Sequence, residues 1–271
     1  MSELKRDGVL LHYEVYDFTD PWLKPETVLL HHGCGKHSRF WYRWIPVLAR
    51  KYRVVVIDAR GFGQSSDPGP AYQWSLKGFA DDVIAVIDHL GVDKFHFVGE
   101  YMGAWVGIEL SLAYPQRLAS LVFSAVPYFW TTAANMTDPI DNVGVKEWQL
   151  AEEPYRFGGD PVYGTWFAEE FARSRTEVVK SVIRAASAVD FRGRISEIQC
   201  PVLALLGELY VRKNNAEAAV EDMKRQLNDR SEVVVLKGGP MFAIYTMAED
   251  CAARAAGFFE RVREDRESKR K

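Results

Sequence analysis

The sequence predicts an α/β fold in which helices cover both faces of a mostly parallel, doubly wound sheet. Short runs of strand-forming residues alternate with amphipathic helical patterns along the chain. The segment Lys94–Gly107, KFHFVGEYMGAWVG, passes from a strand-like run into a helical pattern. Within it, Gly99 and Gly103 lie two residues either side of Tyr101, which is typical of a sharp, strained strand-to-helix turn. We call residues 99–103 the elbow.

The first elements are expected to be strands with one helix between them. Leu11–Val15 alternates apolar and polar residues shortly after a DG pair, which predicts part of an antiparallel edge hairpin. Thr27–Leu30 predicts a buried strand that opens into a glycine-containing loop. Apolar and aromatic residues spaced near 3.6 predict a helix at Arg39–Arg50, and the run RVVVID predicts a strand at Arg53–Asp58.

The next elements keep strands and helices in alternation. Leu76–Leu90 has an apolar helical face. The helix after the elbow is expected to reach Tyr114, because Pro115 cannot continue it. Leu118–Val126 predicts the following strand. This regular alternation of strands and helices favours parallel strands joined by right-handed crossovers.

Residues 127–195 interrupt the alternation with many aromatic residues, helical patterns and few strand signals. We interpret them as an inserted helical lid, which leaves residues 1–126 and 196–271 as the core domain. After the lid the alternation resumes, with strands expected at Val202–Leu206 and Glu232–Leu236 and helices at Asn215–Leu227 and Met247–Val262.

Composition favours a cytoplasmic protein that acts on a small molecule. The net charge of −3, from 34 basic and 37 acidic residues, gives no reason to expect nucleic acid or a membrane surface as partner. Cys34, Cys200 and Cys251 have no paired spacing, so we expect neither disulfides nor a metal site. No phosphate-binding or dinucleotide fingerprint occurs, and we expect no cofactor. A monomer or a homodimer is equally compatible with the sequence.

Five motifs follow one another in a fixed order: HHGCG, DARGFGQSS, FVGEYMG, PVLALLGE and VVLKGGP. In this order they resemble the α/β-hydrolase fold superfamily, in particular its lid-bearing enol-lactonase and C–C hydrolase types, from about Leu10 to Val262. The resemblance implies an eight-stranded-type sheet. It also implies a serine nucleophile at the elbow, an acid after a late strand and a histidine after the last strand.

The resemblance places these three catalytic positions on Tyr101, Tyr210 and Pro240, so all three are substituted. The six histidines of the chain all lie between residues 12 and 96. No alignment can therefore supply a histidine after the last strand. We conclude that the standard triad is absent.

Other groups remain that could support chemistry. By resemblance, the backbone N–H groups of Cys34 and Met102 form an oxyanion hole. Tyr101 either transfers a proton, as a donor or when deprotonated as a base, or merely fills the old cavity. His37 either reaches the pocket mouth, where it would titrate near neutrality, or is an exposed loop residue. Glu100 is a further candidate, although polar residues are common at its position in the family.

The predicted lid is rich in aromatic residues. Such density suits an apolar or aromatic ligand enclosed between lid and sheet, although the same residues also serve to pack the lid. The residues that we expect to line this substrate pocket are Tyr128, Trp130 and Trp166.

Three functions are compatible with these observations. The first is a cofactor-independent enzyme that uses acid–base chemistry without a triad, as a lyase, isomerase, decarboxylase or cyclase, on a small apolar or aromatic carbonyl compound. The second is a catalytically inactive relative that binds a small ligand or a protein partner. The third is an atypical ester or lactone hydrolase.

Overall fold

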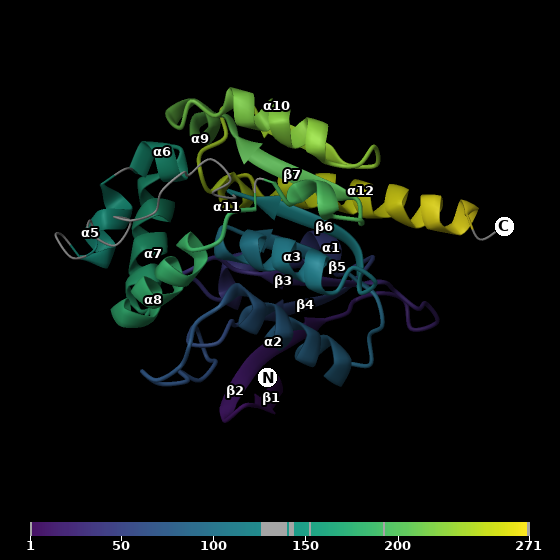
Figure 1. The fold of residues 1–271 in the computed structure, drawn as a ribbon, viewed down its shortest axis with the longest axis horizontal. Helices are drawn as coiled ribbons and strands as arrows, with labels where there is room; N and C mark the ends of the chain where they lie inside the picture. The colour runs from purple at the N-terminus through teal and green to yellow at the C-terminus, as the bar shows by residue number, and fades with distance from the viewer. Residues whose placement is uncertain (1, 126–139, 141–143, 152, 192, 270–271) are drawn as a thin grey trace.

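The computed structural model describes residues 2–125, 140, 144–151, 153–191 and 193–269 (Figure 1). An eight-stranded sheet runs through them in the order β1-β2-β4-β3-β5-β6-β7-β8. The pairs β1–β2 and β2–β4 are antiparallel, and the remaining pairs are parallel. The predicted mostly parallel sheet is therefore confirmed. Its strands are β1 Ser2–Arg6, β2 Val9–Tyr16, β3 Thr27–His31, β4 Arg53–Ile57, β5 Phe95–Glu100, β6 Leu118–Ser124, β7 Val202–Gly207 and β8 Glu232–Leu236.

The predicted edge hairpin consists of β1 and β2. Asp7 and Gly8 join the strands with φ values of 49° and 79°. Positive φ at both central residues is the geometry that matches the right-handed twist of a hairpin, which explains the DG pair.

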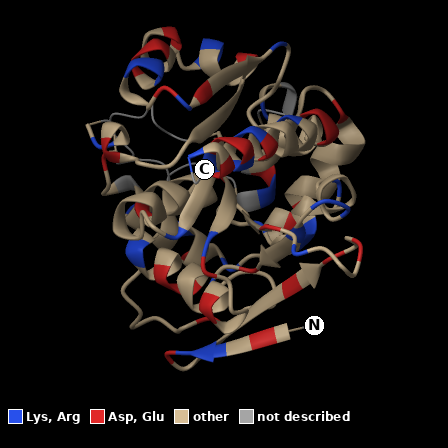
Figure 2. Ribbon diagram, turned by 90° about the vertical axis from the view of Figure 1, so that its right-hand side faces the viewer, with Lys and Arg blue, Asp and Glu red and all other residues tan. Residues whose placement is uncertain are grey.

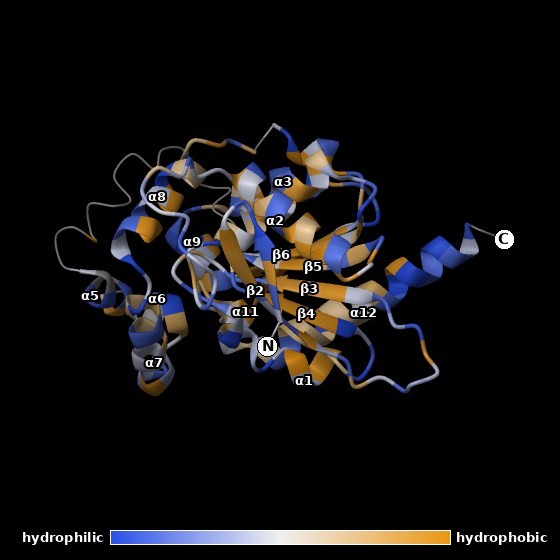
Figure 3. Cartoon of the chain, turned by 90° about the horizontal axis from the view of Figure 1, so that it is seen from below, coloured by the Kyte–Doolittle hydropathy of each residue, from blue (hydrophilic) through white to orange (hydrophobic). Residues whose placement is uncertain are grey.

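The helices before and after the lid alternate with the strands. Figure 3 shows α2 and α3 on one side of the sheet and α1 on the other, where α1 contacts α12. Because helices cover both faces, β3, β5, β6 and β7 are buried along their whole length. These elements are η1 Ser38–Trp41, α1 Ile45–Leu48, α2 Leu76–His89, α3 Met102–Ala113, η2 Ile195–Glu197, α9 Glu208–Lys213, α10 Glu217–Gln226, α11 Ala243–Thr246 and α12 Ala248–Ser268.

The single helix expected at Arg39–Arg50 is wrong. The segment forms the short 3-10 helix η1 and then the separate one-turn helix α1. Pro46 lies in the first turn of α1 and has no backbone N–H, so the hydrogen-bond ladder of a preceding helix cannot continue through it. The break lets the Trp44 indole N–H reach the Ile244 carbonyl at 2.7 Å.

The described residues between β6 and β7 are mainly helical and lie at the left of Figure 1, beyond the carboxyl ends of the strands. They contact the core through α6 and α9. The helices are α5 Val145–Leu150, α6 Glu153–Phe157, α7 Pro161–Ala172 and α8 Thr176–Ser187.

Charged residues of both signs are interspersed along α12 and over the face shown in Figure 2. In the described part of the chain, the helices are too short or too polar to span a bilayer.

Candidate active site

Tyr101 is at the tip of the predicted elbow, between β5 and α3. Its φ of 50° and ψ of −107° place a non-glycine residue in a strained backbone conformation. Its N–H donates to the Ser124 carbonyl oxygen at 3.0 Å, which anchors the turn to β6. A Cβ on Gly103 would lie 2.4 Å from the His31 carbonyl oxygen, so only glycine fits there. The elbow that the sequence predicts is present, with a phenol at its tip.

A cavity of about 190 Å³ lies beside Tyr101, between the loop after β3, the helices α5–α8, the end of α9 and the loop after β8. Among the described residues that line it, Lys36, Arg156 and Lys213 are cationic, and none is a carboxylate. Gln149 and Asn214 add neutral polar groups. The remaining lining residues are Cys34, Tyr101, Tyr155, Phe171, Ile183, Met241 and Phe242.

Lys36 forms a buried ion pair with Glu100. The Lys36 Nζ lies 3.0 Å from the Glu100 Oε2, and the two side chains are 1% and 0% exposed. Because β3 and β5 are parallel neighbours, with His31 opposite Gly99, the residues that follow the two strands meet at one edge of the sheet. A Cβ on Gly33 would lie 2.1 Å from the Glu100 Oε2. Gly33 therefore leaves the space that the carboxylate occupies.

Burial shifts both members of the pair toward their neutral forms. Desolvation raises the pKa of Glu100 and lowers the pKa of Lys36, while their mutual attraction opposes both changes. The Tyr245 hydroxyl donates to the Glu100 Oε2 at 3.4 Å. The Glu100 Oε1 is buried and has no hydrogen-bond partner among the described residues. The neutral and ionised forms of this pair are thus closer in free energy than they would be in water.

Aromatic rings surround the Lys36 ammonium group. The Lys36 Nζ lies 4.4 Å from the ring centre of Phe242 and 5.3 Å from that of Phe167. It also lies 5.8 Å from the ring centres of Tyr101 and Phe171. Ring faces attract a cation, but they do not replace the hydrogen bonds of water.

Tyr101 is protonated at neutral pH. Burial raises the pKa of its phenol well above the usual value, and the nearby phenol of Tyr210 adds to the shift. The group can therefore donate a proton or a hydrogen bond, whereas a role as base or nucleophile would need a phenolate that this surrounding disfavours.

The other two positions at which the resemblance places the triad lie near the same cavity. Tyr210, at the start of α9, is fully buried, and its ring stacks 6.5 Å from that of Tyr155, which lines the cavity. Pro240 precedes Met241 and Phe242, which also line it. A Cβ on Gly207 would lie 2.0 Å from the Pro240 carbonyl oxygen, so this loop packs directly on the end of β7.

Cys34 and Met102 lie where the resemblance places oxyanion donors. Met102 is the first residue of α3, where a backbone N–H has no partner within the helix. The Cys34 thiol instead donates to the Val179 carbonyl oxygen at 3.7 Å, and burial raises the pKa of the thiol to about 12. Its sulfur is thus not a nucleophile at neutral pH. The backbone role of both residues stays a prediction.

His37 does not line the cavity beside Tyr101. Its Nε2 lies 3.0 Å from the Glu170 Oε2 of α7, and its ring faces a different cleft of about 600 Å³ that Asp58 and Arg173 also line. His37 immediately precedes η1, whose first turn directs the imidazole toward α7. The pairing of His37 with Tyr101 in one site, which the sequence suggested, is therefore not observed.

His31 and His32 support the loop after β3. The His32 Nε2 accepts from the Ala59 N–H at 2.9 Å, which leaves its Nδ1 to donate to the Gly33 carbonyl at 2.7 Å. The Nδ1 of His31 lies 2.8 Å from the His32 carbonyl oxygen. Burial lowers the pKa of both imidazoles. Both imidazoles are therefore neutral groups that hold the loop in place.

One serine–imidazole pair occurs elsewhere in the described chain. The His96 Nδ1 lies 2.7 Å from the Ser120 Oγ, and the His96 Nε2 lies 3.3 Å from the Glu26 Oε2. The pair lies toward the amino ends of β5 and β6, whereas Tyr101 follows the carboxyl end of β5. His96 and Ser120 are both 0% exposed. This pair is part of the core and is remote from the lid.

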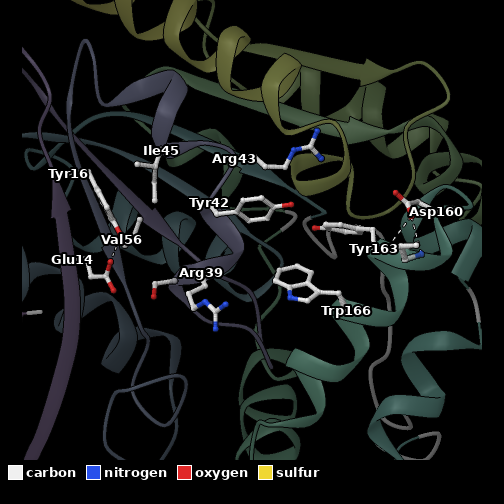
Figure 4. Close-up of a pocket in the computed structure, with 12 residues that line it drawn as sticks. Glu14, Tyr16, Arg39, Tyr42, Arg43, Ile45, Val56, Asp160, Tyr163 and Trp166 are labelled. Atoms are coloured by element: carbon white, nitrogen blue, oxygen red, sulfur yellow. Dashed lines mark hydrogen bonds between the residues drawn. The ribbon is translucent and has the colours of Figure 1, made fainter.

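Trp166 lines an outer groove rather than the cavity beside Tyr101. The groove has a volume of about 630 Å³ and lies between η1, the end of β2 and α7 (Figure 4). The rings of Tyr42 and Tyr163 both pack against that of Trp166, with 5.9 and 5.6 Å between ring centres, and their hydroxyl ends point toward one another. Tyr128 and Trp130, the other residues predicted to line the substrate pocket, lie outside the described residues.

A family model described as the alpha/beta hydrolase fold matches residues 26–158. Together with the fold and the elbow, this match shows that the chain belongs to the α/β-hydrolase fold superfamily. Among curated proteins it is similar to proteins that carry the provisional name carbamate hydrolase RutD. The protein from Agrobacterium fabrum is 27% identical over 213 residues, 72% of this chain and 78% of the relative. That from Caulobacter segnis is 29% identical over 214 residues, 73% of this chain and 77% of the relative.

Solved structures agree on the fold. Est816, described as an N-acyl homoserine lactone degrading enzyme, has a TM-score of 0.80 and 22% identity, and the alignment covers 95% of this chain and 100% of Est816. The enol-lactonase from Burkholderia xenovorans LB400 has a TM-score of 0.79 and 19% identity, and the alignment covers 96% of this chain and 100% of the enol-lactonase. At these identities the likeness establishes the fold alone. The names of the relatives favour hydrolysis over other chemistry.

Proposed function

We propose that this protein is an enzyme that transfers protons at a small carbonyl compound bearing a carboxylate, without forming a serine acyl-enzyme. The observation that carries the proposal is the buried Lys36–Glu100 pair beside the protonated phenol of Tyr101, in a cavity lined by cationic side chains. This ligand differs from the apolar or aromatic molecule that the lid composition predicts, because Arg156 and Lys213 favour an anion.

The size and charge of the cavity support a small oxo acid as substrate. Its volume of about 190 Å³ lies below the roughly 300–1,000 Å³ of drug-sized ligand sites. Arg156, whose Nη1 already donates to the Gln149 Oε1 at 2.8 Å, is oriented on α6 and presents a guanidinium group suited to a carboxylate. Lys213 lies 4.1 Å from the ring centre of Tyr155 and adds a second positive charge.

The chemistry follows from the protonation states. The carbonyl oxygen of the substrate accepts a hydrogen bond from Tyr101. When the neighbouring α-carbon loses a proton, or loses a carboxylate group as CO₂, this oxygen gains negative charge, which the phenol stabilises. The Lys36–Glu100 pair takes up and returns the proton, because burial brings its ionised and neutral forms closer in free energy than they are in water. Enolate formation, isomerisation and decarboxylation share this step.

Proton exchange tests the proposal directly. Pyruvate, 2-oxobutanoate and levulinate are incubated with the protein in D₂O, and loss of their α-hydrogen signals is followed by NMR. We expect enzyme-dependent exchange with at least one of them, and a decrease of roughly 100-fold or more in Tyr101→Phe, the size typical of general acid catalysis. Exchange that is unchanged in Tyr101→Phe would remove this residue from the mechanism.

Hydrolysis is the second candidate, and the names of the RutD relatives favour it. In that case water attacks the carbonyl carbon of a small anionic carbamate or ester, and the oxyanion is held by Tyr101 and backbone N–H groups. A panel of such compounds, with product analysis in ¹⁸O-labelled water, separates the two candidates. Release of labelled acid without α-hydrogen exchange would favour hydrolysis.

A further inference from the structure

Lys36 combines three features that a solvated lysine lacks. Its side chain is 1% exposed yet lines the cavity. Rings of Phe242 and Phe167 surround its ammonium group. Its ion-pair partner, Glu100, lies behind it, fully buried, and does not line the cavity among the described residues. The amine therefore faces the cavity on one side and a carboxyl group on the other.

We propose that the Lys36 Nζ is a nucleophile that forms an imine with the carbonyl carbon of a small oxo-carboxylate held in this cavity. The inference deepens the proposed function and rests on it, because it assigns the group that activates the substrate. Amines are made nucleophilic by desolvation in an apolar pocket or by a neighbouring cation, and both conditions occur here. Arg156 supplies the neighbouring cation.

The position of the proton supports this role. Burial is the largest influence on both groups, lowering the pKa of Lys36 and raising that of Glu100. The same influence favours transfer of the shared proton from the amine to the carboxyl group. The Glu100 Oε1, which has no hydrogen-bond partner among the described residues, is an acceptor with room for that proton.

The step balances in atoms and charge. The lone pair of the neutral Lys36 amine attacks the carbonyl carbon, and proton transfer gives a neutral carbinolamine. The proton held by Glu100 then leaves with the hydroxyl group as water, and a C=N bond forms. The products are an iminium on Lys36, a Glu100 carboxylate and one water molecule. The buried ion pair is thereby replaced by another ion pair at the same place, so no uncompensated charge is created.

Other side chains at the cavity are less suited to this bond. The Cys34 thiol points to Val179 and has a pKa of about 12, and the phenol of Tyr101 is protonated. Lys213 also lines the cavity, but it belongs to α9 and lies against the ring of Tyr155, whereas Lys36 has the buried Glu100 carboxylate beside it. It is the matched control for Lys36.

Borohydride reduction of the full-length protein with pyruvate tests the inference. Reduction converts an imine into a stable secondary amine, which intact mass measurement and peptide mapping locate. We expect one reduced pyruvyl group on Lys36 and complete loss of labelling in Lys36→Met. In Lys213→Met the label should stay on Lys36, although more pyruvate is needed to reach the same extent, because a positive charge of the cavity has been removed. Because Lys36→Met leaves Glu100 without its partner, Lys36→Met/Glu100→Leu serves as a second variant in which no buried charge remains, with folding checked by circular dichroism.

The outcomes separate this inference from the proposed function. Labelling confined to Lys213, or absent while α-hydrogen exchange of pyruvate proceeds, would overturn the imine and leave proton-transfer chemistry intact. Absence of both labelling and exchange with all three oxo acids would overturn both. Labelling of Lys36 together with exchange supports both.

Discussion

A Cβ atom on Gly99 would lie 2.2 Å from the carbonyl oxygen of Gly103, so the backbones of β5 and α3 are in direct contact at the elbow. We expect Gly99→Ala to reduce the free energy of unfolding by about 3 kcal/mol, because a rigid backbone atom cannot move aside. Urea unfolding measures the change. The matched control is Gly257→Ala in α12, where a Cβ meets only the flexible Arg261 side chain at 3.6 Å. This control should instead gain about 0.5–1 kcal/mol.

Placing serine at the tip of the elbow should not give the protein serine-hydrolase activity. A serine hydroxyl needs a neighbouring base, and the position expected to supply it carries Pro240. We expect Tyr101→Ser to hydrolyse p-nitrophenyl acetate no faster than the wild-type protein and to resist labelling by a fluorophosphonate. A serine esterase treated in parallel provides the positive control. Stoichiometric labelling of residue 101 would show that another base reaches it.

Removing one member of the Lys36–Glu100 pair should destabilise the fold, whereas replacing both members with apolar residues should change its stability little. Removing one partner of a buried ion pair typically destabilises a protein by about 3–5 kcal/mol, whereas apolar replacement of both is often neutral. We therefore expect Lys36→Met to lower the unfolding free energy by about 3 kcal/mol, and Lys36→Met/Glu100→Leu to recover most of it. A double-mutant cycle in urea gives the coupling energy. Additive losses in the cycle would mean that the two groups do not interact.

Arg156 should distinguish carboxylates from neutral ketones. A charge-assisted hydrogen bond contributes about 1.5–3 kcal/mol, or roughly 10- to 100-fold in affinity. We expect Arg156→Met to weaken binding of pyruvate by that factor while leaving acetone binding unchanged, as measured by ligand-observed NMR. Arg39→Met, in the outer groove, is the control and should change neither. Equal loss for both ligands would indicate that the substitution disturbs the lid instead.

The free energy of unfolding should decrease as the pH falls below about 6.5. Burial lowers the pKa of His31 from 6.5 to about 4, so its folded-state pKa is depressed. The resulting stability is fully present above pH 6.5 and is lost as the pH falls toward 4, because the unfolded imidazole binds a proton that the folded one does not. The shift corresponds to about 3 kcal/mol. Urea unfolding between pH 7 and 4 measures the loss, and an NMR titration of the folded protein that placed the pKa of His31 above 6 would contradict it.

The order of strands and helices, the elbow and the edge hairpin could be predicted from sequence, because each leaves a local pattern. Gly99 and Gly103 are separated by the spacing that a close backbone approach requires, and the DG pair matches the turn between β1 and β2. The break between η1 and α1 had a local signal too, in Pro46, but aromatic periodicity outweighed it in the prediction.

The candidate site was harder to predict, because its groups meet only through the sheet. Lys36 and Glu100 are distant in sequence and are brought together by the pairing of β3 with β5. A signal was present, since Lys36 follows one predicted strand and Glu100 ends another. The ion pair was missed because sequence gives no measure of burial. His37 and Trp166 lie near the cavity in the chain but face other clefts, since the direction of a side chain depends on local geometry.

Two positive groups of the cavity come from separate parts of the chain, Arg156 from α6 and Lys213 from α9, which follows β7. An anion that binds both would act as a bridge that fastens one part to the other. Ligand binding and the contact between α6 and α9 would then be thermodynamically linked, and the ligand-free protein would expose α6 to proteases more readily than the ligand-bound protein.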